Sequence, residues 1–279
     1  MINFTKMHGT GNDYIYIHDG KSAIKNPGKL SRAISDRHFG VGSDGLIVIY
    51  PSTKADFKMR MFNPDGSEAE MCGNGIRCFA KYVFDRGMTS ARQITVETLA
   101  GIKHLTLHAK NGKVSSVQVD MGEPILRRDK IPMIGEQGMV INESLHLDDG
   151  TRFYITALSV GNPHAVIFVE DVENFPVSKY GPIIENHQLF PQRTNVEFVQ
   201  IVNPDEVIQR TWERGTGETF SCGTGASAVA AACVLNNACN RNITVHLKGG
   251  DLKLEWREKD NHIYLTGPAV EVFQGTWDY

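Results

Sequence analysis

Runs of apolar and alternating residues predict that most of this chain folds as β-sheet. Strand-like stretches, rich in β-branched and aromatic residues, fall at 14–17, 46–50, 57–62, 165–169, 196–199 and 207–212. Strict alternation adds 112–121 and 251–256. Because these strands come in runs and do not alternate regularly with helices, the pattern favours an α+β fold over a doubly wound one.

Helical periodicity appears in three places. Apolar residues along 76–84 recur at the spacing of one helix face, and 226–235 is apolar on all sides, which is typical of a central, buried helix. A third helix is predicted over 27–37. Each half of the chain therefore contains several strands and one buried helix, and a cysteine, Cys72 or Cys222, stands just before that helix.

The two halves also repeat each other at a constant shift of 150 residues. Gly11-Asn12 aligns with Gly161-Asn162, Leu46–Ile49 with Val196–Val199, Arg60 with Arg210, Glu68 with Glu218, and Cys72-Gly73-Asn74-Gly75 with Cys222-Gly223-Thr224-Gly225. Chance likeness between Gly-rich turns does not keep one register over more than sixty residues. We therefore predict two copies of one domain, residues 1–122 and 123–267, with the boundary at the turn residues 122–124.

Composition and charge narrow the function classes. The chain has 279 residues, 41% of them hydrophobic and 22% charged, with a formal net charge of −3. It has no apolar run of 18 residues and no basic-then-apolar N-terminus, so we expect a cytoplasmic protein that does not associate with membranes. The absence of excess positive charge argues against nucleic acid as a partner.

Five cysteines occur, an odd number, and none forms a C-x-x-C pair. A zinc ribbon, a thioredoxin motif and a disulfide framework are therefore not expected, and no metal site is predicted. Free cysteine is often simply a small buried apolar residue. We accept that interpretation for Cys78, Cys233 and Cys239, which lie inside apolar stretches.

The paired placement of Cys72 and Cys222 points instead to chemistry. The first N–H groups of a helix are unpaired and carry partial positive charge, so the thiolate is favoured and each pKa is expected to fall below about 8.5. The same groups offer a place for a carboxylate. A phosphate cradle is the alternative, but neither a P-loop nor a dinucleotide-binding glycine motif is present.

If the repeats face one another, the two cysteines flank one cleft. One thiolate then removes the α-proton of an amino acid, and the opposite thiol returns a proton to the other face. Backbone N–H groups stabilise the charge that spreads onto the substrate carboxylate. The sequence thus suggests inversion of an amino-acid stereocentre by two cysteines.

Polar residues close to the repeat motifs are candidate ligand contacts. Any single asparagine beside glycine is usually a turn former, but four of them recur with the repeat geometry: Asn12, Asn63, Asn162 and Asn195. Arg214 suits a carboxylate because its guanidinium binds bidentately, the alternative being a surface ion pair. His164 and Glu213 are candidates for tuning the cysteines.

These motifs carry a resemblance to the diaminopimelate epimerases that extends over almost the whole chain, from His8 to Val270. Its most specific stretches are 63–68, 71–78, 161–164 and 212–225. The resemblance implies two pseudo-symmetric domains, each a curved, mostly antiparallel sheet around a central helix, with the active-site cleft between them. It also implies catalysis without a cofactor, a homodimer, and conversion of LL- to meso-diaminopimelate in lysine and cell-wall precursor biosynthesis.

The resemblance also assigns roles to residues. Cys72 and Cys222 are the acid/base pair, assisted by His164 and Glu213, and the reacting carboxylate is held by Gly73, Asn74, Gly223 and Thr224. The distal amino-acid centre is read by Asn12, Asn63, Asn162, Asn195, Glu213 and Arg214. The final segment, 268–279, is expected to rejoin the first domain. Some members carry glutamine where this chain has Gly45, so one distal contact is expected to be missing or replaced by water.

Two other functions stay open on the sequence. One is racemisation of a different amino acid, such as histidine, on the same fold. The other is a non-catalytic, redox-sensing amino-acid-binding protein in which Cys72 and Cys222 form a regulatory disulfide. Proton exchange with solvent separates an enzyme from a binding protein, and the substrate that exchanges identifies the enzyme.

Overall fold

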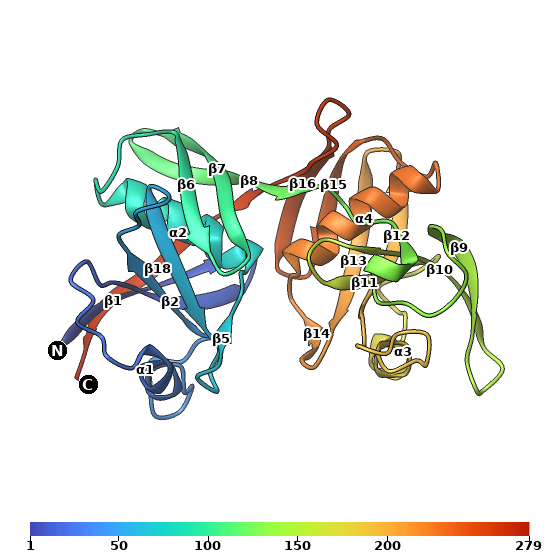
Figure 1. The fold of residues 1–279 in the computed structure, drawn as a ribbon, viewed down its shortest axis with the longest axis horizontal. Coiled ribbons are helices and arrows are strands. Elements are labelled where there is room, and N and C mark those ends of the chain that lie inside the picture. Colours follow the sequence, from blue (N-terminus) through green and yellow to red (C-terminus); the bar gives the residue numbers. More distant parts are fainter. Residues whose placement is uncertain (279) are drawn as a thin grey trace. The chain divides into compact units, whose positions relative to one another are not determined.

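A computed structural model describes residues 1–278 of the chain (Figure 1). Contacts divide it into two compact units: unit 1 comprises Met1–Asp120 and Thr266–Tyr279, and unit 2 comprises Met121–Leu265. The chain passes between the units twice, inside β8 (Lys113–Gly122) and inside β17 (Ile263–Pro268). Four α-helices and many strands make up the described residues, which confirms the predicted α+β class.

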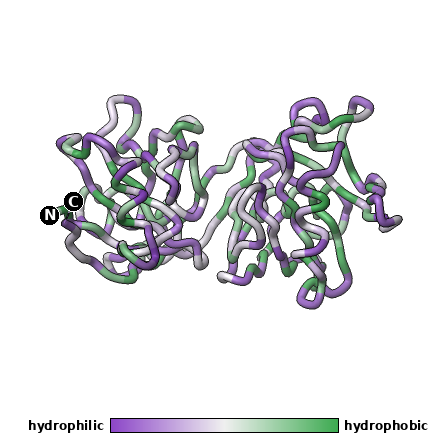
Figure 2. Tube along the Cα trace, turned by 90° about the horizontal axis from the view of Figure 1, so that it is seen from below, coloured by the Kyte–Doolittle hydropathy of each residue, from purple (hydrophilic) through white to green (hydrophobic). Residues whose placement is uncertain are grey.

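Unit 1 is a sheet closed by a strand from the far end of the sequence. Its other elements are β1 (Ile2–Gly9), β2 (Asn12–His18), α1 (Pro27–Ile34), β3 (Leu46–Tyr50), β4 (Phe57–Phe62), β5 (Glu68–Ala69), α2 (Gly73–Asp85), β6 (Gln93–Thr98), β7 (Gly101–Lys110) and β18 (Val270–Trp277). β18 pairs antiparallel with β1, Ile2 opposite Trp277, so the two ends of the chain lie side by side (Figures 1 and 2). Parallel pairing occurs at β2–β3 and β4–β6.

Unit 2 repeats this plan. It contains the short 3-10 helix η1 (Arg128–Lys130), β9 (Val140–His146), β10 (Arg152–Ser159), β11 (Pro163–Phe168), α3 (Val177–Glu185), β12 (Asn195–Asn203), β13 (Glu206–Glu213), β14 (Gly217–Thr219), α4 (Gly223–Leu235), β15 (Asn242–Leu247) and β16 (Gly250–Trp256). Parallel pairing recurs at β11–β12 and β13–β15, the counterparts of the two parallel pairs in unit 1.

Matching ion pairs confirm that the two units are structural copies. Arg60 on β4 binds Glu68 on β5 through two hydrogen bonds of 2.7 and 2.8 Å. Arg210 on β13 binds Glu218 on β14 in the same bidentate way, at 2.7 and 3.1 Å. Each residue of the second pair lies 150 positions after its counterpart in the first pair, which is the shift found in the sequence. The internal repeat therefore governs side-chain contacts as well as strand order.

One helix fills the core of each unit. In Figure 1, α2 and α4 each lie across the strands of their own unit, and Figure 2 shows the hydrophilic residues gathered mainly at the turns. Ten residues of α2 and ten of α4 are buried, which confirms the prediction of a central helix from the all-apolar stretch 226–235. Both helices begin three residues earlier than predicted, directly after Cys72 and Cys222.

Two further differences from the predicted elements have local causes. The first helix ends at Ile34 and not at residue 37, because the following residues turn back so that the N–H groups of Val41 and Gly42 bond to the Ile34 carbonyl. Helix α3 was missed, since it contains Pro182, which removes a backbone donor and obscures the helical pattern. None of the helices within residues 1–278 has the length and apolar character needed to cross a membrane.

Replacement of Phe198 by alanine tests the core of unit 2. This side chain has no exposed surface and lies 4.5 Å, centroid to centroid, from the ring of Phe175. Truncation leaves a cavity, so we expect a loss of about 3–5 kcal/mol in the free energy of unfolding, measured by urea denaturation. Val202→Ala, at a side chain that is 50% exposed, is the control and should change stability by less than about 0.5 kcal/mol. Equal effects of the two variants would contradict the assigned core.

Candidate active site

Both predicted cysteines occupy the same backbone position, the N-cap of the central helix. Cys72 precedes α2 with φ −132° and ψ 122°, and Cys222 precedes α4 with φ −122° and ψ 113°. The Gly75 N–H points at Cys72 Sγ (3.4 Å) and the Gly225 N–H at Cys222 Sγ (3.3 Å). Each sulfur therefore takes the place of the side-chain oxygen that usually caps a helix and lies beside the unpaired N–H groups of the first turn.

Around Cys72, the structure brings together two of the predicted contacts. Asn12 Oδ1 accepts hydrogen bonds from Cys72 Sγ (3.3 Å) and from Asn74 Nδ2 (3.4 Å). Asn12 is itself held by Asp44, whose carboxylate accepts from Asn12 Nδ2 at 2.7 Å and from Arg37 at 2.8 Å. The first turn of α2 and the start of β2 thus form one polar cluster at the cysteine.

Tyr14 belongs to this cluster and was not identified from the sequence. Its ring is almost fully buried, and its hydroxyl hydrogen-bonds with Cys72 and Asn12. Burial is the main reason that the pKa of Tyr14 lies well above its usual value, and the neighbouring Cys72 raises it further. The internal repeat could have identified Tyr14, because it lies 150 residues before His164, which was singled out from the sequence.

In unit 2, the buried side chains of His164 and Glu197 contact each other near the second cysteine. His164 has no exposed surface, and its Nδ1 lies 2.8 Å from Glu197, which is also fully buried. The other ring nitrogen lies 2.9 Å from Asn162 Oδ1. The sequence identified His164 and Asn162 but missed Glu197, which is placed between two apolar residues of a strand and whose Oε2 atom has no partner among the described residues.

Glu213 directly contacts Cys222. It hydrogen-bonds with this thiol and accepts a bond from the hydroxyl of Thr219. Burial raises the pKa of Glu213, the Thr219 bond opposes the rise, and the charge of Glu197 adds to it. Thr224 Oγ1 lies 3.4 Å from Cys222 Sγ, so the first turn of α4 also contributes a polar contact.

The expected fall in pKa is wrong for Cys222. Burial raises its pKa well above the usual thiol value, and the charges of Glu213 and Glu197 raise it further. The hydrogen bonds from Thr224 and the Gly225 N–H lower it, but they are the smaller effects. Loss of solvent and two nearby carboxylates therefore outweigh the helix N-terminus at this cysteine.

Three other predicted contacts hold the local fold. Asn63 Nδ2 donates to Ser67 Oγ (3.0 Å) inside the turn after β4. Asn195 is buried and links two backbone groups, the Pro163 carbonyl (2.9 Å) and the Arg214 N–H (2.9 Å). The guanidinium of Arg214 donates to the Gln192 carbonyl (2.9 Å) and forms no ion pair within residues 1–278, so it has capacity left for a carboxylate.

We expected a glutamine contact to be missing at Gly45, and the structure leaves no room there for a longer side chain. Its φ is +155°, and a Cβ there would stand 2.4 Å from the Phe62 carbonyl oxygen. The backbone around Gly45 therefore requires glycine, and a glutamine contact of that kind is absent from this part of the structure.

The remaining cysteines are mostly inert, with one correction. Cys78 and Cys233 are buried, and burial raises the pKa of Cys78 to about 11. Cys239 is only partly buried, and a hydrogen bond with Cys233 lowers its pKa, so it is not the buried apolar residue that we expected. It lies in the loop after α4, because that helix ends at Leu235.

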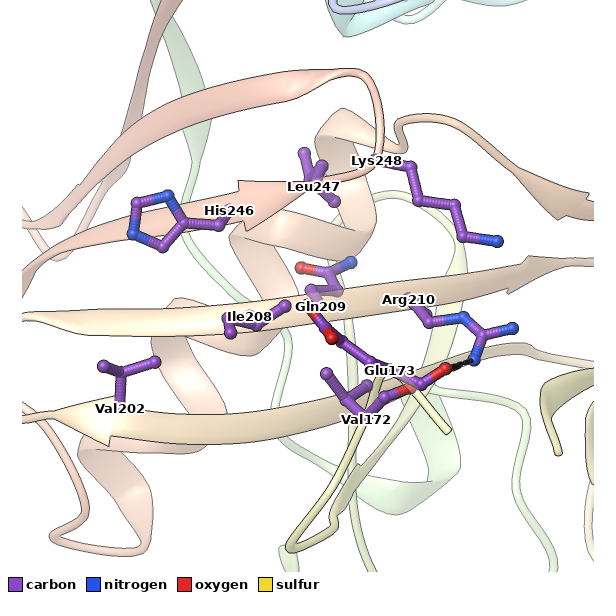
Figure 3. A pocket seen from close by; sticks show the side chains of 9 residues that line it. All are labelled: Val172, Glu173, Val202, Ile208, Gln209, Arg210, His246, Leu247 and Lys248. Carbon is purple, nitrogen blue, oxygen red and sulfur yellow. Dashed lines mark hydrogen bonds between the residues drawn. The ribbon is translucent and has the colours of Figure 1, made fainter. Parts of the chain in front are cut away.

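Unit 2 contains a cavity of about 590 Å³ that is not lined by Cys222 (Figure 3). Its lining consists of Val172, Glu173, Val202, Ile208, Gln209, Arg210, His246, Leu247 and Lys248. Arg210 donates to three backbone carbonyls there and is paired with Glu218, so its charge is already used. The lining includes neither cysteine, and no cluster suited to a metal ion occurs in the described chain.

Comparison with known proteins identifies the family of the chain. The family model for diaminopimelate epimerase matches residues 4–126 and 156–272. A diaminopimelate epimerase of Acetivibrio thermocellus is 56% identical over 277 residues, covering 99% of each chain. One of Methanococcus maripaludis is also 56% identical, covering 99% of this chain and all of its own.

Solved structures share the fold at low sequence identity. A probable proline racemase from Agrobacterium radiobacter has a TM-score of 0.73 at 14% identity, covering all of this chain and 93% of its own. A PhzF-family phenazine biosynthesis protein of Bacillus anthracis has a TM-score of 0.71 at 17% identity, covering 98% of both. The fold is thus common to several chemistries, but the near full-length match at 56% identity is specific: the chain belongs to the diaminopimelate epimerase family of isomerases.

Proposed function

We propose that this protein interconverts LL- and meso-diaminopimelate without a cofactor, with Cys72 and Cys222 as the acid/base pair. One observation carries the proposal: two cysteines cap the buried helices of two repeats in the same geometry. Family membership supports the substrate, since the relatives at 56% identity are named diaminopimelate epimerase. We also propose that the protein acts in the cytoplasm, in the synthesis of lysine and cell-wall precursors.

The proposed reaction moves one proton off the α-carbon and one proton on. A thiolate takes the α-proton, so that the C–H bond breaks and an S–H bond forms. The opposite thiol then gives its proton to the other face of the carbanion and becomes the thiolate. Nothing is oxidised or reduced. Because acid and base act on opposite faces, the proposal requires both cysteines to reach one substrate.

Helix N-termini supply the stabilisation that a carbanion needs. Loss of the α-proton pushes negative charge onto the carboxylate, and N–H groups aimed at that charge lower the barrier. We assign this role to the first turns of α2 and α4, at Gly73-Asn74 and Gly223-Thr224. His164 and Glu213 assist: Glu213 bonds to Cys222, and the His164 ring lies 2.8 Å from the neighbouring carboxylate of Glu197.

We assign recognition of the distal amino-acid centre to Asn12, Asn63, Asn162, Asn195, Glu213 and Arg214. Arg214 is the strongest of these candidates because its guanidinium forms no ion pair within the described residues. The other racemase function, on histidine for example, does not require a carboxylate clamp at this end.

We also propose a homodimer. β18 carries Val270, Val272 and Phe273, whose side chains are between 41% and 53% exposed. A cluster of exposed apolar residues along one strand suits burial against a second copy of this chain. Sedimentation at micromolar concentration should give twice the chain mass.

Removal of either catalytic thiol tests the mechanism. Cys72→Ala and Cys222→Ala should each lower the epimerisation rate by at least about 10³-fold, because one proton transfer loses its partner. Circular dichroism should show folded protein in both variants. Cys78→Ala is the control, since this thiol is buried and its pKa is raised to about 11, and it should keep most of the activity. A large loss in the control would mean that the wrong thiols were chosen.

Solvent exchange tests the substrate. In deuterated water, LL-diaminopimelate should gain deuterium at its α-carbon as it converts to the meso form, and mass spectrometry detects the gain. L-Histidine should gain none under the same conditions. Deuterium in histidine alone would establish the other racemase, and no exchange with either amino acid would favour a binding protein.

Replacement of Glu213 separates activity from stability. Because the pKa of Glu213 is raised, the folded protein holds the carboxyl proton more tightly than the unfolded chain does. The contribution of this protonated carboxyl to stability is therefore lost as the pH rises through the pKa of Glu213 in the folded protein. Glu213→Gln should therefore be at least as stable as the wild type at pH 8 and should lose this pH dependence, measured by urea denaturation at pH 5 and pH 8. Its epimerisation rate should nevertheless fall about 10²-fold.

The matched control is Glu136→Gln, at an exposed position, which should alter neither property. If Glu213→Gln destabilised the protein at pH 8 while keeping full activity, the residue would be structural and its assignment to the site would be wrong.

A further inference from the structure

Unit 1 contains a buried positive charge that its fold does not neutralise. Arg77, in the second turn of α2, has no exposed surface. Its guanidinium donates to four neutral oxygens: the Gly73 carbonyl (3.0 Å), Asn74 Oδ1 (2.9 Å), Thr10 Oγ1 (3.3 Å) and the Pro268 carbonyl (3.2 Å). No carboxylate within residues 1–278 forms an ion pair with it. The hydrogen bonds orient the guanidinium but leave its charge in place.

A buried charge without a counter-charge destabilises the fold, so its retention indicates a function. An unpaired buried ion costs several kcal/mol, whereas a well-packed apolar replacement is often neutral or stabilising. Burial lowers the pKa of Arg77, yet a guanidinium stays protonated at neutral pH. The charge therefore has to be compensated by something that is not part of the permanent fold. The ionisable groups whose charges act on it are Cys78, Cys72 and Tyr16. Burial raises the pKa of Cys78 to about 11 and that of Tyr16 well above its usual value, so both keep their protons and Cys72 is left as the counter-charge.

A short chain of hydrogen bonds links Arg77 to the cysteine that the mechanism uses. Arg77 fixes Asn74, Asn74 Nδ2 bonds to Asn12 Oδ1, and the same oxygen contacts Cys72 Sγ. Two acidic groups also belong to this surrounding, but neither cancels the guanidinium. The carboxylate of Asp44 is paired with Arg37 at 2.8 Å, and Tyr14 keeps its proton because burial raises its pKa well above the usual value.

Unit 2 has no positive charge at the position of Arg77 and has a negative charge at a second position that is neutral in unit 1. Ser227 replaces Arg77 and bonds to the Gly223 carbonyl (2.9 Å), just as Arg77 bonds to Gly73. Glu197 replaces Ile47. A Cβ added at Gly75 would stand 2.6 Å from Ile47, and one added at Gly225 would stand 2.7 Å from Glu197, so both side chains face the same point of their helix.

Protonation of His164 cannot reverse the sign of this difference. If the His164 ring is charged, it balances Glu197, and the surroundings of Cys222 are neutral or, through Glu213, negative. If the ring is neutral, Glu197 leaves them negative. In either state of His164, the buried groups around Cys222 carry no net positive charge. The buried groups around Cys72 include the positive charge of Arg77.

We propose that these buried charges decide which thiol is ionised in the ligand-free enzyme, with Arg77 holding Cys72 as the thiolate and Glu197 with Glu213 holding Cys222 as the thiol. Arg77 and Glu197 are positioning residues, since they act through the cysteines and not on the substrate. The inference rests on the proposed two-cysteine function. It states which cysteine is the base and which is the acid before substrate binds, a difference that the repeated backbone geometry alone does not provide.

Titration of single thiols tests the inference without turnover. In protein that carries Cys222→Ala together with Cys239→Ala, which removes the other thiol of lowered pKa, the thiolate absorbance near 240 nm should report Cys72 with a midpoint below about 8.5, the ordinary thiol value. In Cys72→Ala/Cys239→Ala protein, Cys222 should ionise above that value. The readout does not depend on access to reagent, which matters because Cys222 is the more buried of the two. A midpoint at Cys72 equal to or above that at Cys222 would overturn the proposal.

Arg77 variants, made in the Cys222→Ala/Cys239→Ala background, assign the effect. Arg77→Gln should raise the midpoint of Cys72 by about one pH unit or more, a tenfold loss of thiolate, because the charge is gone while hydrogen bonds remain possible. Arg77→Lys keeps the charge and should restore most of the shift. A purely structural role predicts that both variants move the midpoint alike, or that neither does.

The order of ionisation can also be measured on the wild-type enzyme, where misfolding of a variant is not a concern. Alkylation with iodoacetamide across a pH series, followed by peptide mass spectrometry, should show the rate at Cys72 rising at lower pH than the rate at Cys222. Accessibility scales each rate but does not move its pH midpoint. An enzyme that epimerises diaminopimelate with the reverse order would refute this inference alone, while the expected order without turnover would refute only the proposed function.

Discussion

Burial of α2 and α4 inside their sheets is the constraint on which the site depends. Because almost every residue of the first three turns is covered, neither helix can rotate or slide without exposing apolar surface. The N-cap is thereby fixed to within a fraction of a turn, and with it the sulfur of Cys72 or Cys222. The bidentate pairs Arg60–Glu68 and Arg210–Glu218 fasten the strands that lead into each helix.

Local sequence predicted the parts of the fold that local physics determines. The strands around β2–β4 and β11–β13 and the two central helices follow from periodicity, and the repeat supplied their equivalence. The pairing of β18 with β1 joins residues that are more than 260 positions apart, so no local pattern encodes its register. Helix α3 was missed for the opposite reason: Pro182 is a strong local signal against a helix that packing against Trp212 nevertheless stabilises.

The site was predictable where the repeat exposed it. Both cysteines, His164, Asn12 and Glu213 were found because they belong to motifs. Glu197 and Arg77 were not singled out, since a charge inside an apolar strand or helix acquires meaning only when its burial and partners are known. The pKa of Cys222 was misjudged for the same reason: the helix N-terminus can be read from sequence, but loss of solvent and the approach of two carboxylates cannot.

Two identical thiols would make a poor epimerase. With equal and independent pKa values, no more than about half of the molecules hold one thiolate and one thiol at any pH, and those are divided equally between the two forms. In the mechanism that we propose, opposite buried charges separate the two ionisations, so that one working form dominates across the interval between them. Each turnover from that form would end with the thiolate at Cys222, and the charges of Arg77, Glu197 and Glu213 would then favour the return of the proton. The duplicated backbone supplies two equivalent positions, and the residues that break the duplication make them act in sequence.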